Sequence, residues 1–216
     1  MSKIEFTKRL LIFTIGLFFS ALGIAFSKQA DLGVSTVSSV ANVLSLKFDF
    51  ISFGMWSAIM NIAFVLGQII ILKKNFKLFQ LMQIPMSFLF GIFTDIGMYI
   101  VSFIPTPNYA VRMLLTIAGI LILAFGIALA VIADVLYNSG EGLVKAVSDV
   151  SGKDFGIVKV AFDIACVLTA AILSIIFFNF KILGIREGTL MAAVFTGFIV
   201  NFFTKFLTKP ITKLFK

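Results

Sequence analysis

The chain consists of long apolar runs separated by short polar stretches, and this pattern predicts transmembrane helices. Each of six runs is close to the roughly 20 apolar residues that a helix needs to cross the hydrocarbon of a bilayer. The runs lie at about 9–28, 52–73, 81–104, 111–134, 156–180 and 186–206. The separators are polar or contain proline and glycine, as at 73–75, 105–108 and 138–142. We expect an all-α integral membrane protein with six transmembrane helices.

Composition supports a membrane protein over a soluble one. Of the 216 residues, 60% are hydrophobic, 13% are charged and 27 are phenylalanine. A soluble domain of this length could not bury so much apolar surface. We therefore treat 1–216 as a single membrane domain. The apolar run that follows Lys8 and Arg9 also resembles a signal peptide, but we expect it to remain in the mature protein because its end belongs to a repeated segment.

The repeated segment indicates an internal duplication. Residues 22–31 and 125–134 match at five of ten positions with an offset of 103. Residues 61–66 and 163–168 match at an offset of 102, and Gly91 with Asp95 recurs as Gly197 with Asn201 at an offset of 106. We assign repeat 1 to about 9–104 and repeat 2 to about 111–206. Duplicated halves are typical of membrane transporters.

The number of spans per repeat predicts how the halves are oriented. Each repeat holds three spans, an odd number, so the second repeat enters the membrane from the opposite side and the halves are inverted. The net charge is +8. If the N-terminus is cytoplasmic, twelve Lys and Arg residues lie inside and five outside, which favours cytoplasmic N- and C-termini. Reporter fusions after residues 45 and 145 should then face opposite sides.

Each repeat also contains a segment too short and too polar to span the membrane, at 34–47 and at 139–151. One interpretation is an amphipathic helix that lies at the interface. The other is a half-helix that dips into the membrane and points its partly positive N-terminus at an anionic group. In that case the hydroxyls near the start of the first segment would be donors, namely Ser35, Thr36, Ser38 and Ser39.

Ionisable and amide side chains at membrane depth are the candidates for a substrate or ion site, because charge in hydrocarbon is costly. The candidate residues are Asp163, Lys159, Asn61, Glu141, Arg186, Glu187, Asp31, Asp134, Asp95 and Asn201. Asp163 and Lys159 are four residues apart and can pair on one helical face. The alternative for Lys159 is a snorkelling side chain, and for Asp163 and Asp95 a packing residue bonded to a neighbouring helix. The alternative interpretation of Asp31, Asp134, Arg186 and Glu187 is that each lies at a solvated or capped helix end.

Several function classes find no support in the residues. The chain has no histidine, one cysteine, and no Walker, HExxH or CxxC motif, so we expect no enzyme activity, no cofactor and no metal site. The basic residues sit at predicted helix ends, where membrane orientation accounts for them, and we expect no nucleic-acid partner.

The chain resembles the YczE/YyaS/YitT group of small bacterial integral membrane proteins. The resemblance is carried by Ala-Asp-Leu-Gly-Val-Ser at 30–35, residues 138–143, Lys159 with Asp163, and Gly-Ile-Arg-Glu-Gly-Thr at 184–189. Many members have Pro-Trp where this chain has Thr36-Val37. The resemblance implies a multi-pass protein of the bacterial cytoplasmic membrane that acts as a transporter or exporter.

These observations predict a secondary transporter of a small polar or amphipathic solute that works by alternating access. The lipid bilayer and the solute are the expected partners, with proton or sodium as a coupling ion and a homodimer as one candidate assembly. Asp163 and Asn61 would face each other at the repeat interface, and Lys159 or Arg186 would bind an anionic group. The alternatives are a membrane-embedded binding subunit of an energised uptake complex, an accessory protein that transports nothing, and a channel.

Overall fold

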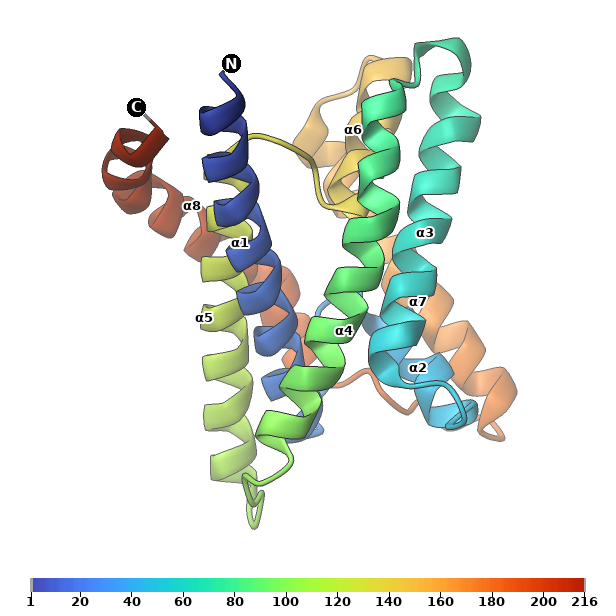
Figure 1. The fold of residues 1–216 in the computed structure, drawn as a ribbon. Helices are drawn as coiled ribbons and strands as arrows, with labels where there is room; N and C mark the ends of the chain where they lie inside the picture. Colours follow the sequence, from blue (N-terminus) through green and yellow to red (C-terminus); the bar gives the residue numbers. More distant parts are fainter. Residues whose placement is uncertain (1, 216) are drawn as a thin grey trace.

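A computed structural model describes residues 2–215, and the described chain is all-helical (Figure 1). Its elements are α1 (Lys3–Ala30), α2 (Ser39–Lys47), α3 (Phe53–Leu72), η1 (Lys73–Asn75), η2 (Leu78–Met82), α4 (Gln83–Val101), α5 (Tyr109–Ala133), α6 (Ser139–Ser151), α7 (Phe155–Phe177) and α8 (Glu187–Phe215). The helices long and apolar enough to cross a membrane number six among the described residues, and they are α1, α3, α4, α5, α7 and α8. The predicted all-α membrane architecture is confirmed.

Short polar side chains set where the long helices begin. The Ser52 hydroxyl accepts from the Met55 N–H at the start of α3, and the Asn108 side chain accepts from the Val111 N–H at the start of α5. Asp154 caps α7 in the same way. Each cap satisfies a backbone N–H that the first helical turn leaves free.

Two aspartates end the matching helices α1 and α5 in the same unusual conformation. Asp31 has φ 54° and Asp134 has φ 50°, so both are left-handed. Asp and Asn tolerate this region better than most residues, since their short side chains bond locally. The repeated Ala-Asp pair is therefore a repeated helix stop.

Helices α1 and α5 pack closely against each other through four glycines. A methyl group added to Gly23 would lie 2.6 Å from the Gly119 carbonyl oxygen, and one added to Gly16 would lie 2.7 Å from that of Gly126. The repeat offset of 103 relates Gly16 to Gly119 and Gly23 to Gly126. Exchanging the two repeated segments therefore turns the Gly16–Gly126 contact into the Gly119–Gly23 contact. Only glycine allows the two backbones to approach this closely.

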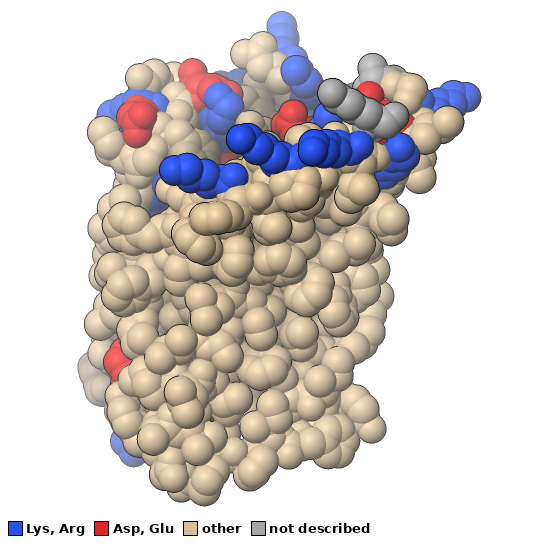
Figure 2. Space-filling model, turned by 90° about the vertical axis from the view of Figure 1, so that its left-hand side faces the viewer, with Lys and Arg blue, Asp and Glu red and all other residues tan. Residues whose placement is uncertain are grey.

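The helices that correspond by sequence run in opposite directions. In Figure 1, α1 and α4 descend from the end that carries both termini, whereas α5 and α8 rise towards it; α3 rises and α7 descends. We call the end with the termini the upper end and the other the lower end. On the face shown in Figure 2, basic side chains gather at the upper end, above a broad band that is almost free of charged side chains.

The short helices α2 and α6 begin inside the bundle. Their first turns are buried, while their last residues are more exposed. A methyl group on Gly140 of α6 would lie 3.3 Å from a Val37 methyl just before α2, so the two N-terminal ends nearly meet. This arrangement favours the half-helix interpretation of both segments over helices lying on the rim.

Helix boundaries agree with the predicted spans except at the ends of the chain. Helix α1 begins at Lys3, before its apolar run, and α8 continues through Pro210 to Phe215. The extension of α8 is held by Ile211 and Phe215, which pack against Leu129 and Ile132 of α5. Tertiary packing therefore carries α8 beyond the apolar pattern.

Candidate functional site

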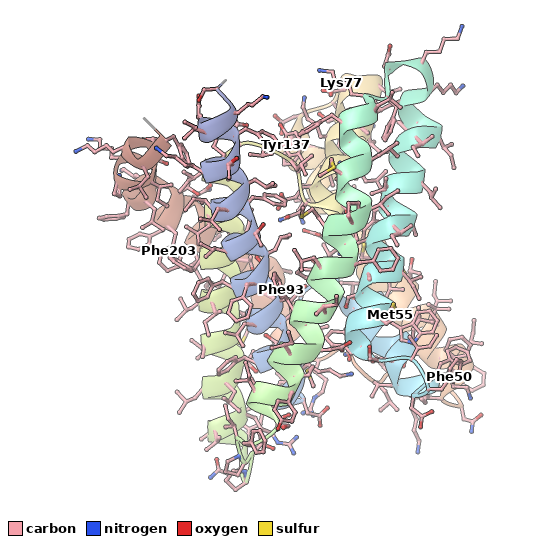
Figure 3. All side chains as sticks on the ribbon, viewed as in Figure 1. Phe50, Met55, Lys77, Phe93, Tyr137 and Phe203 are labelled. Carbon is pink, nitrogen blue, oxygen red and sulfur yellow. The ribbon has the colours of Figure 1, made fainter. Side chains whose placement is uncertain are left out.

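A cavity of about 750 Å³ lies between the two halves of the described chain. Its walls come from α1, α3, α4, α5, α6, α7 and α8 and from the segments that precede α2 and α6. Tyr137, on the segment between α5 and α6, lies between the upper parts of α1 and α4 (Figure 3). This volume is typical of sites for drug-sized ligands.

The cavity walls are mostly apolar and carry a small charged group. The apolar walls include Phe13, Leu17, Ile24, Phe90, Leu123 and Ile127. The ionisable residues in the lining are Tyr137, Glu141, Lys159 and Asp163. An apolar chamber with a few converging polar groups is the usual form of a small-molecule site.

Asp163 and Lys159 form the ion pair that their spacing predicts. The Lys159 ammonium donates to both carboxylate oxygens of Asp163. The Thr36 hydroxyl also donates to Asp163, at 3.0 Å, from the segment before α2. The carboxylate thus links the segment before α2 to the long helix α7, and its charge is balanced within the site.

Glu141 lies in the first turn of α6 and has no ion-pair or hydrogen-bond partner among the described side chains. Its side chain is half-buried, and its accessible part faces the cavity. Burial raises the pKa of Glu141 to about 6, and the nearby Lys159 only partly opposes this effect. The residue can therefore gain or lose a proton near neutral pH.

Five of the ten predicted site residues line this cavity: Asp163, Lys159, Asn61, Glu141 and Asn201. Asp95 lies elsewhere and joins α4 to the start of α3. Its carboxylate accepts from the Ser52 hydroxyl at 2.6 Å and from the Gly54 N–H at 2.8 Å.

The remaining four predicted residues lie at helix ends outside the cavity lining. Asp31 and Asp134 end α1 and α5. Arg186 donates to the Asp31 carbonyl at 3.0 Å and pairs with Glu187. Arg186 is therefore bound at the lower end and does not line the cavity. Among the described lining residues, Lys159 carries the one ammonium group.

A buried amide pair that the sequence analysis did not identify positions α6. Gln68 of α3 and Gln83 of α4 exchange hydrogen bonds of 2.9 and 3.1 Å, and Gln68 also donates to the Ser139 carbonyl at 3.1 Å. The sequence could have predicted this pair, because both glutamines lie in or beside apolar spans and an amide in hydrocarbon requires a hydrogen-bond partner. This network holds the start of α6, and with it Glu141, against the first half.

The two halves differ in how their last two helices pack. Helices α3 and α4 are in close contact, whereas the corresponding α7 and α8 are not among the packed helix pairs of the described chain. A methyl group on Gly54 would lie 2.1 Å from the Gly91 carbonyl oxygen. At the corresponding glycines of the second half, a methyl group on Gly156 would meet only the Asp154 side chain, and one on Gly197 would meet nothing within 4 Å.

The same asymmetry recurs between the first and last helices. The Gly188 N–H at the start of α8 donates to the Leu32 carbonyl at 2.8 Å, which seals the lower end of α1 against α8. The corresponding pair, α4 with α5, is not among the packed pairs of the described residues. Gly54 lies in the first turn of α3 and Gly188 in the first turn of α8, and both helices begin in the lower half of the molecule, whereas α7, which carries Gly156 in its first turn, begins in the upper half (Figure 1). The sealed contacts therefore lie towards the lower end.

No group of three or more His, Cys, Asp or Glu side chains that could hold a metal ion occurs among residues 2–215.

Comparison with known proteins identifies a family but no function. A family of unknown function, DUF6198, matches residues 7–205. No curated protein and no solved structure matches the chain. Because the match extends from α1 into α8 and covers most of the sequence, the chain belongs to the DUF6198 family.

Proposed function

We propose that this protein is a secondary transporter in which two inverted repeats alternately open a shared central cavity to the two sides of the membrane. The observation that carries the proposal is the asymmetry between matched helix pairs around that cavity, with α3 packed on α4 and α7 apart from α8. In an inverted duplication, exchanging the conformations of the two halves generates the opposite state. That state would have α7 packed on α8 and α3 apart from α4.

Three further features support inverted repeats. The two glycine contacts between α1 and α5 are related to each other by the repeat offset. Asp31 and Asp134, at matching positions, share a left-handed conformation. Helix α2 contacts α7, just as its counterpart α6 contacts α3. The resemblance to the YczE/YyaS/YitT group, whose members are thought to be transporters, agrees with this proposal.

The distribution of basic residues gives the proposed orientation. With the upper end in the cytoplasm, the basic surface of Figure 2 obeys the positive-inside rule, and both termini are cytoplasmic in a bacterial cell membrane. The structure would then represent the state open to the cytoplasm, since the sealed contacts lie at the lower end.

Cross-linking tests this proposal without knowledge of the substrate. In a Cys166→Ser background, the test variant carries Asp154→Cys and Asn201→Cys, which are on α7 and α8. The matched control carries Ser52→Cys and Asp95→Cys, whose native side chains touch at 2.6 Å. Mild oxidation in membranes should bridge the control pair at once and the test pair more slowly, because α7 and α8 must first close. If the control pair forms a bridge and the test pair never does, alternating access between these contacts is wrong.

A further inference from the structure

The charges inside the cavity do not balance. The lining contributes two carboxylates, Glu141 and Asp163, and one ammonium, Lys159. Lys159 is already bonded to both oxygens of Asp163. Glu141, a half-buried lining residue with no ion-pair partner among the described side chains, therefore adds a net negative charge to the cavity when it is ionised.

The N-terminal ends of α2 and α6 do not reverse this balance. The partial positive charges of these two helix ends act on carboxylates that the protein itself supplies. Glu141 is in the first turn of α6, and Asp163 accepts from the Thr36 hydroxyl just before α2. An anionic solute would have to displace Asp163 from Lys159 and leave a second carboxylate unpaired. A cation needs only to approach Glu141.

The walls and the opening of the cavity indicate which kind of cation it accepts. Apolar residues such as Phe13, Leu17 and Phe90 surround the charged group, and aromatic faces also attract cations. The lining also holds hydroxyl and amide oxygens, such as those of Ser20 and Asn61, which are the ligand type of a small inorganic cation. A volume of about 750 Å³, however, matches a drug-sized ligand and is far larger than a single ion needs. Some residues of α7 and α8 that line the cavity, namely Val160, Val194 and Phe198, are also exposed on the outside of the protein, so the wall between these helices is thin and a ligand with apolar groups can approach from the lipid.

We propose that the cavity is a binding site for an amphipathic organic cation, with the Glu141 carboxylate as the counter-ion and the apolar walls holding the body of the ligand. This inference rests on the proposed transport function and specifies its substrate class. A proton and the cation compete for the same carboxylate, so binding of one releases the other. The charged groups that face Glu141 are Lys159 and Asp163 of α7, and these remain paired in both forms.

The test uses a pair of probes that match in size and shape and differ in charge. Titration calorimetry at pH 8 measures the binding of tetraphenylphosphonium and of tetraphenylborate to the full-length protein. We expect tetraphenylphosphonium to bind at least about tenfold more tightly than tetraphenylborate, since the charge–carboxylate interaction in a low-dielectric cavity exceeds the energy of a tenfold change.

Variants assign the effect to Glu141. Glu141→Gln should weaken tetraphenylphosphonium binding by at least about tenfold, and Glu141→Asp, which keeps the charge, should retain most of it. Asp149→Asn, which removes an exposed carboxylate paired with Lys145 on the same helix, should have no effect. A monodisperse elution profile shows whether each variant is folded, and the Asp variant keeps the test valid if the Gln variant does not fold.

Three results would overturn the inference: no binding of tetraphenylphosphonium, equal affinity in Glu141→Gln, or tetraphenylborate binding as tightly as its cationic counterpart. None of these affects the cross-link between residues 154 and 201. If that bridge forms while the cation fails to bind, the transport proposal stands and only the substrate class is wrong.

Discussion

Adding a single methyl group at Gly54 should move the protein towards the opposite state. In the structure this methyl group would lie 2.1 Å from the Gly91 carbonyl oxygen. A carbon–oxygen contact needs about 3.3 Å, so α3 and α4 would have to separate by roughly 1 Å. Overpacking of this kind costs about 1–3 kcal/mol, which changes a two-state equilibrium about 5- to 150-fold. The cost falls on the state in which α3 and α4 are in contact.

Gly156→Ala is the matched variant and should act in the opposite direction. In the structure its methyl group meets only the Asp154 side chain, at 3.0 Å, and this contact is absent once Asp154 has been replaced by cysteine. In the proposed opposite state, Gly156 would face Gly197 as Gly54 now faces Gly91. The variant should therefore leave the present state unchanged and destabilise the other.

The assay is the rate of bridge formation between cysteines at 154 and 201 under a fixed oxidant concentration. Gly54→Ala should raise this rate towards the 5- to 150-fold range, and Gly156→Ala should lower it. Melting temperatures of both variants control for general destabilisation. The reasoning is refuted if Gly54→Ala slows the reaction or leaves it unchanged, or if both variants act in the same direction.

Three further predictions concern the charged and amide groups. First, tetraphenylphosphonium affinity should rise with pH through about 6 and lie roughly tenfold lower at pH 5 than at pH 8, since the pKa of Glu141 is raised to about 6 and only its ionised form binds; a flat calorimetric pH profile would contradict this. Because the folded-state pKa of this acid exceeds its ordinary value of 4.5, the protonated group favours the fold below pH 4.5 and this contribution is lost as pH rises through about 6; Glu141→Gln should flatten the thermal-shift profile between these values. Second, Asp163→Asn should lower the melting temperature because Lys159 loses its partner, and a double change with Lys159→Gln should recover most of the loss; no recovery would mean that the pair is not the cause. Third, Gln68→Leu should cost about 1–3 kcal/mol in chemical denaturation by stranding the Gln83 amide, and an unchanged midpoint would show that this network does not support the fold.

The fold could largely be predicted from the sequence because lipid imposes simple requirements. A span needs a long apolar run, and the six runs became six helices with ends near their predicted positions. The ion pair of Lys159 with Asp163 was also predictable, since a four-residue spacing places both side chains on one helical face.

Features that depend on how helices pack were not predictable from a single sequence. Asp95 and Asp163 are both carboxylates within apolar runs of the sequence, and both were candidates for the site. In the structure Asp95 joins two helices outside the cavity lining, while Asp163 lies in the cavity wall. The difference comes from the rotation of each helix about its axis, which apolar runs exposed to lipid on several sides do not determine. In the proposed mechanism the separation of α7 from α8 is likewise a property of one state, and a single sequence would have to encode both states.

The most direct test of the central proposal is whether the contact between α7 and α8 forms in molecules that have lost the contact between α3 and α4. A variant with cysteines at 52, 95, 154 and 201 in the Cys166→Ser background can form a bridge in either half. After mild oxidation, intact mass and peptide mapping count and locate these bridges. The account predicts two populations with a single bridge, one between 52 and 95 and the other between 154 and 201, while molecules that hold both bridges would be trapped with both ends closed. The absence of any molecule bridged between 154 and 201 alone would contradict the account, because the opposite state would then not form.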